Sequence, residues 1–206
     1  MPKDSYLLTT ALPVGVYCLQ HINLSAVGNI VDFLNLMGYD FHGHWTSVSG
    51  HHAQLCGPMN DGQTCAQAER SCTSGVDYVI SRGFPANKIL LGVPVYARYF
   101  HQAKGPRERF VGAGEMEYNG IPSEWISSAA IDEAAGAASV VDDQSGGKGF
   151  VSFDVPGTVT MKAKYVKEQG LGGLFYWTAA GDRNDGQSLV LAGHKELQQG
   201  QANEGC

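Results

Sequence analysis

Four short stretches of the chain are largely apolar and are bounded by Gly, Pro or polar residues. Each is seven or eight residues long. A run of this length is typical of a strand that is buried on both faces, as in a parallel sheet. The pattern therefore predicts four strands, at Tyr6–Leu12, Phe33–Asp40, Ile89–Tyr96 and Leu171–Trp177.

Between these strands, apolar residues recur at helical spacing. The spacing predicts three helices: one after Ser25 that buries Val27, Ile30 and Val31, one at about 74–82 that ends at Gly83, and one that Thr158 caps and Gly170 ends. Strands that alternate with helices indicate an α/β protein with a parallel sheet covered by helices.

Three segments depart from this alternation. Residues 41–72 form a long loop rich in His, Gly and Cys, and loops of this length are usually functional. Residues 99–155 are rich in Gly and lack strong periodicity until Phe150–Phe153, which indicates an inserted subdomain. Residues 198–206 are polar, and we expect a disordered tail.

The composition narrows the class of protein. Of the 206 residues 43% are hydrophobic and 17% charged, which is typical of a globular chain. The formal net charge is −6, with both signs mixed along the sequence, so we expect no nucleic-acid partner. No apolar run approaches the roughly 20 residues of a membrane span, and we expect no membrane partner.

Candidate chemistry gathers where the predicted strands end. Tyr39 and Asp40 close the second strand, Tyr96 and Arg98 follow the third, and Trp177 ends the fourth. In parallel α/β folds these ends meet at one edge of the sheet. Aromatic faces beside a carboxylate and a guanidinium suit a sugar ring. Two further aromatic residues beyond the second strand, Phe41 and Trp45, are predicted to extend this surface.

A family resemblance is carried by three motifs. The segments are Leu36-Met37-Gly38-Tyr39-Asp40-Phe41-His42-Gly43-His44-Trp45, Lys88-Ile89-Leu90-Leu91-Gly92-Val93-Pro94-Val95-Tyr96-Ala97-Arg98 and Gly170-Leu171-Gly172-Gly173-Leu174-Phe175-Tyr176-Trp177. They resemble the sixth, seventh and eighth strands of family 18 glycoside hydrolases, the chitinases, and most closely the fungal class V enzymes. The run Ala11-Leu12-Pro13-Val14-Gly15 is similar to the fifth strand.

The resemblance implies a partial (β/α)8 TIM barrel with a small α+β insertion after strand seven. Residues 1–98 would hold strands five to seven, 99–155 the insertion, 156–197 strand eight with its flanking helices, and 198–206 the tail. The implied substrate is chitin or oligomers of β-1,4-linked N-acetylglucosamine. In the family the acetamido oxygen of the substrate is the nucleophile of a retaining, substrate-assisted reaction.

The same resemblance assigns roles to single residues. Tyr39 matches the tyrosine that donates a hydrogen bond to the N-acetyl group, and Asp40 matches an aspartate that helps to hold the sugar. Substrate-binding positions are matched by Met37, Trp45, Tyr96, Arg98 and Trp177. Among these, Trp177 matches the tryptophan beneath the distorted sugar, and Trp45 a stacking surface on the leaving-group side.

One motif of the family is absent from the printed sequence. The family's general acid is the glutamate that ends Asp-x-x-Asp-x-Asp-x-Glu on strand four, and no such motif occurs here. General acid catalysis is typically worth about 10²–10⁴-fold in rate, so we expect little turnover by this chain alone. The alternatives are a non-catalytic chitin-binding lectin or effector and a truncated gene product without function. A second copy of the chain, or a missing N-terminal half, is the expected partner that closes the barrel.

The cysteines and histidines of the long loop leave two questions open. A secreted protein would pair two of the three clustered cysteines Cys56, Cys65 and Cys72, for instance Cys56 with Cys65, and otherwise the thiols remain unpaired. An extracellular location rests on the resemblance, because the run Leu7–Leu19 makes a poor signal peptide. Zinc ligation by His42, His44, His51, His52 and Cys56 matches no standard spacing, so we expect neither a metal nor a cofactor.

Overall fold

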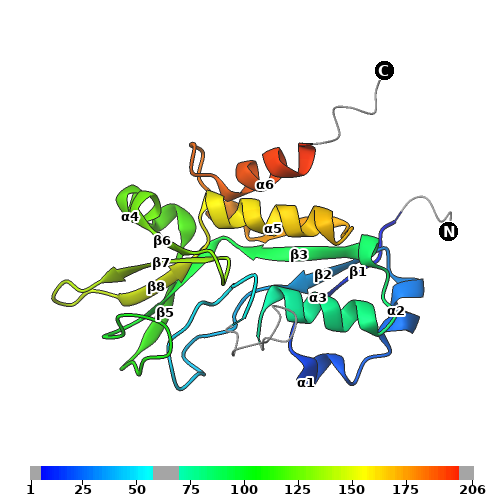
Figure 1. The fold of residues 1–206 in the computed structure, drawn as a ribbon, viewed down its shortest axis with the longest axis horizontal. Helices are drawn as coiled ribbons and strands as arrows, with labels where there is room; N and C mark the ends of the chain where they lie inside the picture. Colours follow the sequence, from blue (N-terminus) through cyan, green and yellow to red (C-terminus); the bar gives the residue numbers. More distant parts are fainter. Residues whose placement is uncertain (1–5, 58–69, 200–206) are drawn as a thin grey trace.

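The main sheet of the protein consists of four parallel strands. The computed structural model describes residues 6–57 and 70–199. The strands are β1 (Thr9–Pro13), β2 (Phe33–Met37), β3 (Ile89–Pro94) and β9 (Gly173–Trp177), in the spatial order β1-β2-β3-β9. Leu36 lies in register with Leu12 on one side and with Leu91 on the other. The predicted parallel α/β arrangement is confirmed (Figure 1).

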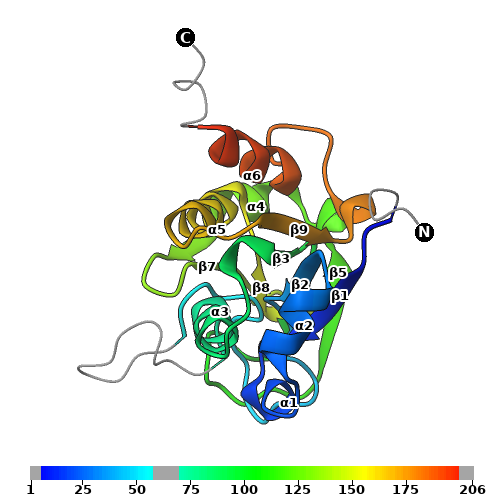
Figure 2. The same ribbon diagram turned by 90° about the vertical axis from the view of Figure 1, so that its right-hand side faces the viewer.

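Helices cover one face of this sheet. They are α1 (Val16–Leu19), α2 (Leu24–Ile30), α3 (Cys72–Ser81), α5 (Pro156–Glu168) and α6 (Leu189–Gln198). Figure 2 shows α3 and α5 on the same side of the parallel strands. Leu34, Leu36 and Leu91 point to that side and are fully buried in a core with Val76 and Val79 of α3. Alternate residues of β2, among them Asn35 and Met37, are only half-buried.

A second, antiparallel sheet follows the third parallel strand. Its strands are β4 (Tyr96–Phe100), β5 (Ala113–Glu117), β6 (Ala130–Asp132), β7 (Ala137–Asp142) and β8 (Gly149–Phe153), in the order β5-β4-β8-β7-β6. The helix α4 (Ser123–Ser128) and the 3-10 turn η3 (Tyr118–Gly120) connect β5 to β6. The turns η2 (Ala86–Lys88) and η4 (Ala179–Gly181) flank β3 and β9.

A buried ion pair joins the end of the second sheet to α5. Lys162 is fully buried, and its Nζ lies 2.5 Å from Oδ2 of Asp154, which follows β8. The Thr158 hydroxyl lies 2.7 Å from the other carboxylate oxygen and donates to it. Neither charge has access to water, so separating the two groups would leave each of them buried and unpaired. The pair therefore holds α5 against β8.

Several local predictions need correction. Tyr96 and Arg98 lie on β4, because the chain turns at Val95 from the parallel sheet into the antiparallel one. The helix predicted after Ser25 already begins at Leu24, since the Asn23 side chain accepts a hydrogen bond from the Ala26 N–H. Ile30, predicted to be buried, is 69% exposed.

Two further predictions concern helix ends. The prediction that Thr158 caps α5 is wrong, because Val155 occupies the N-cap position. Thr158 is the third residue of the helix, and its hydroxyl accepts a hydrogen bond from the Val155 N–H. Gly83 and Gly170 follow α3 and α5 with φ angles of 84° and 62°, a left-handed conformation that glycine adopts at little cost, so both predicted helix ends are confirmed.

The described part of the chain does not form a closed barrel. Its parallel sheet has β1 and β9 at the two edges, and neither edge pairs with a further described strand. The tail from 200 onward lies outside the described residues, so its predicted disorder stays a prediction. Among the described helices, none has the length and hydropathy that a membrane crossing requires.

Candidate functional site

Asp40 is the centre of a polar cluster at the carboxyl end of β2. Its φ angle is 64°, an uncommon conformation that Asp tolerates better than most residues. Oδ1 accepts a hydrogen bond of 2.7 Å from the Tyr96 hydroxyl and another of 2.7 Å from Nε of Arg98. Both donors come from the start of β4, so the turn between the two sheets brings them to the carboxylate.

The charge on Asp40 is stabilised by its neighbours. Burial, the largest effect, acts to raise the pKa of Asp40. The imidazole, guanidinium and phenol around the carboxylate act in the opposite direction and hold its pKa well below the usual range. For Tyr96, burial and the hydrogen bond to Asp40 raise the pKa of the hydroxyl. The site therefore holds a carboxylate anion and a protonated phenol at neutral pH.

Tyr39 lies beneath this cluster. Its ring makes edge contacts with the rings of Tyr96 and Phe175, with centroid distances of 6.2 and 6.3 Å. Burial, with a smaller contribution from the Asp40 charge, raises the pKa of Tyr39 to about 12. Gly92 permits this packing, because a Cβ there would come within 2.8 Å of the Tyr39 and Phe175 rings.

Arg98 connects the carboxylate to an exposed indole. Its guanidinium carbon lies 4.7 Å from the ring centre of Trp45, a distance typical of a cation–π contact. Its Nη1 also lies 3.3 Å from a carboxylate oxygen of Glu115. Glu115 is opposite Arg98 in the register of β4 and β5. Trp45 remains 50% exposed, so one face of the indole is available to a ligand.

A pocket of about 170 Å³ opens above these groups. Its lining residues are Asp40, Tyr96, Arg98, Glu115, Glu117, Trp177 and Thr178. We call this pocket, together with Tyr39 and Trp45, the candidate site. Trp177, which ends β9, is 58% exposed. A carboxylate, a guanidinium and exposed indoles can bind a polar ligand that has an apolar face.

Comparison with known proteins identifies the family. The model of "Glycosyl hydrolases family 18" matches residues 2–182. The chain belongs to this family. It is 33% identical over 200 residues to "Chitinase 1" of Aphanocladium album, covering 93% of this chain and 46% of that protein. It is also 33% identical over 201 residues to "Endochitinase 1" of Metarhizium anisopliae, covering 93% of this chain and 45% of that protein.

A solved structure agrees with this assignment. A mutant class V chitinase from Nicotiana tobaccum in complex with NAG4 superposes with a TM-score of 0.76 and 28% sequence identity, covering 93% of this chain and 56% of that chain. The likeness places the fold among the TIM-barrel-like α/β proteins. This family 18 chain spans about half the length of the curated relatives it matches.

The structure brings most of the predicted site residues together. Asp40, Tyr96, Arg98 and Trp177 line one pocket, Tyr39 packs beneath it, and Trp45 stacks on Arg98. Met37 is half-buried on β2 and does not line the pocket. Phe41 does not extend the aromatic surface as predicted, because it is buried in the core under the parallel sheet.

Four residues of this region were not predicted as site residues: Glu115, Glu117, Thr178 and His52. Glu115 and Glu117 lie on β5, a strand with no apolar alternation, so no sequence pattern singles them out. The pairing of β5 with β4 places them opposite Arg98 and Tyr96. Thr178 follows Trp177 across a cis peptide bond.

Two histidines of the long loop, His42 and His51, make hydrogen bonds that hold the loop in place. Nδ1 of His42 lies 2.9 Å from the carbonyl oxygen of His51, and Nδ1 of His51 lies 3.3 Å from the Ser152 hydroxyl. Burial lowers the pKa of His42, of His52 and of His51, the last to about 4. Within the described residues, no group of three His, Cys, Asp or Glu side chains could hold a metal ion.

Cys56 of the same loop takes part in a disulfide. A free thiol is therefore the wrong alternative for Cys56. Its expected partner, Cys65, lies outside the described residues, so the predicted pairing stays a prediction. Cys72, at the start of α3, is a buried free thiol whose Sγ lies 3.4 Å from the Gly38 carbonyl oxygen.

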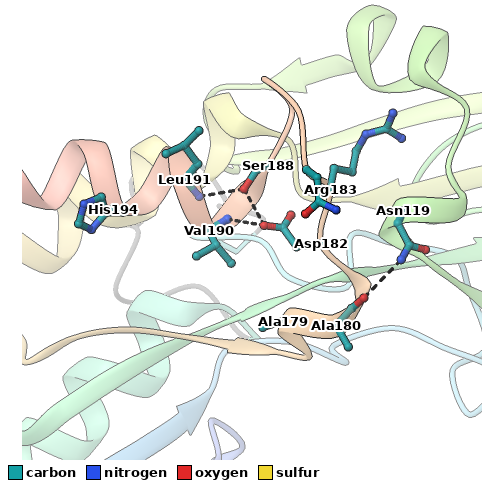
Figure 3. Close-up of a pocket in the computed structure, with 10 residues that line it drawn as sticks. Asn119, Ala179, Ala180, Asp182, Arg183, Ser188, Val190, Leu191 and His194 are labelled. Atoms are coloured by element: carbon teal, nitrogen blue, oxygen red, sulfur yellow. Dashed lines mark hydrogen bonds between the residues drawn. The ribbon is translucent and has the colours of Figure 1, made fainter.

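A larger pocket, of about 680 Å³, is lined by a different set of residues (Figure 3). It lies between the segment after β9 and α6, and Ala180, Asp182, Leu191 and His194 are among its lining residues. The Asp182 carboxylate accepts hydrogen bonds from the Ser188 hydroxyl and from two backbone N–H groups at the start of α6. These bonds stabilise the start of α6.

Proposed function

We propose that this family 18 chain binds oligomers of β-1,4-linked N-acetylglucosamine in the candidate site. The observation that carries the proposal is the Asp40 carboxylate, fixed by Tyr96 and Arg98 beside exposed indoles. A pyranose ring has an apolar face that stacks on an indole and a polar rim that needs charged or hydroxyl partners. The related Nicotiana tobaccum chitinase is described in complex with NAG4, which supports this ligand class.

Four side chains of the candidate site would contact the sugar, each in a different way. Asp40 stays ionised at neutral pH and accepts a hydrogen bond from a sugar N–H or hydroxyl group. Tyr39 keeps its hydroxyl proton because its pKa is raised to about 12, so it can donate to the acetamido oxygen. Trp177 forms the surface beneath one sugar, and Trp45 a surface for its neighbour.

We propose that the chain alone does not hydrolyse the bond that it binds. In the substrate-assisted, retaining reaction of the family, the acetamido oxygen attacks while a carboxylic acid protonates the leaving oxygen. The printed sequence holds no Asp-x-x-Asp-x-Asp-x-Glu motif to supply that acid. Asp40 is a poor substitute, since its neighbours favour the ionised form.

The open sheet supports a proposal about partners. We assign β1, β2, β3 and β9 to strands five to eight of an eight-stranded barrel, with residues 99–155 as the insertion after strand seven. Among the described strands, none pairs with the outer edge of β1 or of β9. Leu7 and Leu8, which precede β1, are exposed. A half-barrel of the same family, or a second copy of this chain, would pair with these edges and remove them from solvent.

An extracellular location is part of the same proposal. Cys56 is disulfide-bonded, and structural disulfides persist mainly in oxidising compartments. The sequon Asn23-Leu24-Ser25 is compatible with glycosylation there, because Asn23 is exposed. Detection of the protein only inside cells, with Cys56 reduced, would contradict this location.

The proposal is tested by calorimetric titration of the purified chain with chitotetraose at neutral pH. We expect saturable binding. Trp177→Ala should abolish it, because the substitution removes the largest exposed surface of the pocket. Tyr17→Ala is the matched control, since Tyr17 is an exposed aromatic residue on α1, away from the pocket.

A fluorogenic chitotriose substrate tests the second half of the proposal. We expect no release of fluorophore above the buffer rate. Turnover that survives purification to homogeneity would show that the chain contains its own proton donor. Absence of both binding and turnover would favour a product without function.

A further inference from the structure

His52 is a fully buried histidine behind the candidate site. Its side chain has no exposed surface, and neither ring nitrogen has a hydrogen-bond partner among the described residues. Buried polar atoms are nearly always paired, because an unpaired one loses its hydration without compensation. An unpaired imidazole at this place therefore requires an explanation.

The position of the ring is fixed from both sides. The His52 carbonyl oxygen accepts a hydrogen bond from the Phe41 N–H, and the His52 N–H lies 3.3 Å from the Ser152 hydroxyl and donates to it. These bonds place the ring against Tyr96, with a centroid distance of 5.2 Å. They also place Nδ1 at 3.9 Å from Oδ1 of Asp40.

The separation of 3.9 Å is too long for a hydrogen bond but leaves no room for another group. Catalytic and binding hydrogen bonds are often long in the free protein and shorten when the ligand binds. A small rotation of the Asp40 side chain toward His52 would shorten this contact. Such a rotation is expected when a sugar bonds to Oδ2, which lies on the same rigid carboxylate.

Electrostatic effects on His52 favour its neutral form. Burial lowers the pKa of His52 and outweighs the opposing effect of Asp40. Asp154 acts in the same direction as Asp40, and Arg98 assists burial. A neutral imidazole carries one N–H, and the tautomer with this proton on Nδ1 directs it toward the carboxylate.

We propose that His52 is a positioning residue that orients the Asp40 carboxylate. In the Nδ1–H tautomer it faces Oδ1 in the free protein and donates a hydrogen bond when a sugar occupies the candidate site. The carboxylate then has a third donor in addition to the two from β4. The ligand in this inference rests on the proposed function, whereas the orientation of Asp40 can be tested without any ligand.

Three variants distinguish the effect of the His52 Nδ1–H group from the effect of the size of the imidazole ring. In His52→Asn the amide nitrogen can occupy the place of Nδ1, in His52→Gln it occupies the place of Nε2, and His52→Leu has neither. His51→Asn is the matched control, since His51 is adjacent in the chain but contacts Ser152 and Phe150. Circular dichroism and thermal unfolding identify any variant that does not fold, and the Gln variant carries the comparison where Leu does not fold.

The ligand-free measurement is the ¹³C chemical shift of the Asp40 carboxyl carbon as a function of pH. We expect the carboxyl of the wild type and of His52→Asn to stay ionised to the lowest pH at which the protein is folded. In the Leu and Gln variants it should titrate at higher pH. Equal titration in the wild type and all three variants would overturn the proposal.

The second measurement is the affinity for chitotetraose. We expect His52→Leu and His52→Gln to bind about tenfold more weakly, the size expected for one lost hydrogen bond to a charged group, and His52→Asn to bind as the wild type does. If the wild type does not bind, the proposed function is wrong, and the carboxyl titration still decides the role of His52. Binding that is equal in Asn, Gln and Leu variants would overturn the role of His52 alone.

Discussion

The Tyr96 hydroxyl donates a hydrogen bond of 2.7 Å to Oδ1 of Asp40, across 56 residues of sequence. Tyr96 begins the antiparallel sheet and Asp40 follows a strand of the parallel sheet. The bond therefore joins the two sheets at the point where the candidate site opens. Its other consequence is electrostatic, because it stabilises the charged form of Asp40.

Replacement of Tyr96 by Phe tests this bond. The Tyr96→Phe variant keeps the ring but loses the donor, so we expect the pKa of Asp40 to rise and the affinity for chitotetraose to fall about tenfold. Calorimetric titration at neutral pH measures the affinity. Tyr99→Phe is the control on the same strand, and it should bind as the wild type does. Unchanged affinity in Tyr96→Phe would show that the bond has no role in ligand binding.

Replacement of Arg98 by Lys tests the planar guanidinium. The guanidinium bonds to Asp40 through Nε and stacks on Trp45. A lysine ammonium cannot make both contacts in the same geometry. We expect Arg98→Lys to increase the quenching of Trp45 fluorescence by iodide and to weaken chitotetraose binding. Equal quenching in the two proteins would contradict the stacked arrangement.

The parallel sheet was predictable because its strands are short runs of mainly apolar residues. Leu34, Leu36 and Leu91 are fully buried under the helices. Burial on both faces was expected for all four strands but holds only for β3, since β1, β9 and the second face of β2 are partly exposed. The antiparallel sheet gave little signal. All three residues of β6 are exposed, and β5 alternates only between half-buried and exposed positions.

The candidate site was predictable to the extent that its residues follow the strand ends. Tyr39, Asp40 and Trp177 do so. Glu115 could not be predicted in the same way, since only the pairing of β5 with β4 places it opposite Arg98. His52 is part of a loop without periodicity, and its distance from Asp40 depends on the contacts of that loop with Phe41 and Ser152.

Stability should depend on pH through His51. Burial lowers the pKa of His51 from its usual value of 6.5 to about 4 in the folded state. The unfolded chain therefore binds a proton that the folded chain does not, so stability is fully present above pH 6.5 and is lost as the pH falls toward 4. The full effect is about 3 kcal/mol, and His42 and His52 add to it in the same direction.

Urea unfolding at pH 7 and pH 5 measures this dependence. We expect a lower free energy of unfolding at pH 5 for the wild type and a smaller difference between the two pH values for His51→Gln. A variant that shows the same difference as the wild type would assign the pH dependence to other groups.

The ion pair of Lys162 and Asp154 should be costly to break on one side. Both side chains are almost completely buried, so Lys162→Met leaves an unpaired carboxylate without water. We expect a loss of about 3–5 kcal/mol in the free energy of unfolding. The double variant Lys162→Met/Asp154→Leu should lose less, because no buried charge remains. Urea unfolding of the two variants compares them, and an equal or larger loss in the double variant would contradict this explanation.

The most direct test of the sugar-binding proposal uses the three tryptophans of the chain. Trp45 and Trp177 belong to the candidate site, whereas Trp125 on α4 is partly buried against the core of the second sheet. The measurement is a titration of the indole ¹H–¹⁵N signals with chitotetraose at neutral pH. The account predicts saturable shifts of the Trp45 and Trp177 signals with the Trp125 signal unmoved. Three unmoved signals at saturating ligand, or a shift of Trp125 alone, would contradict it.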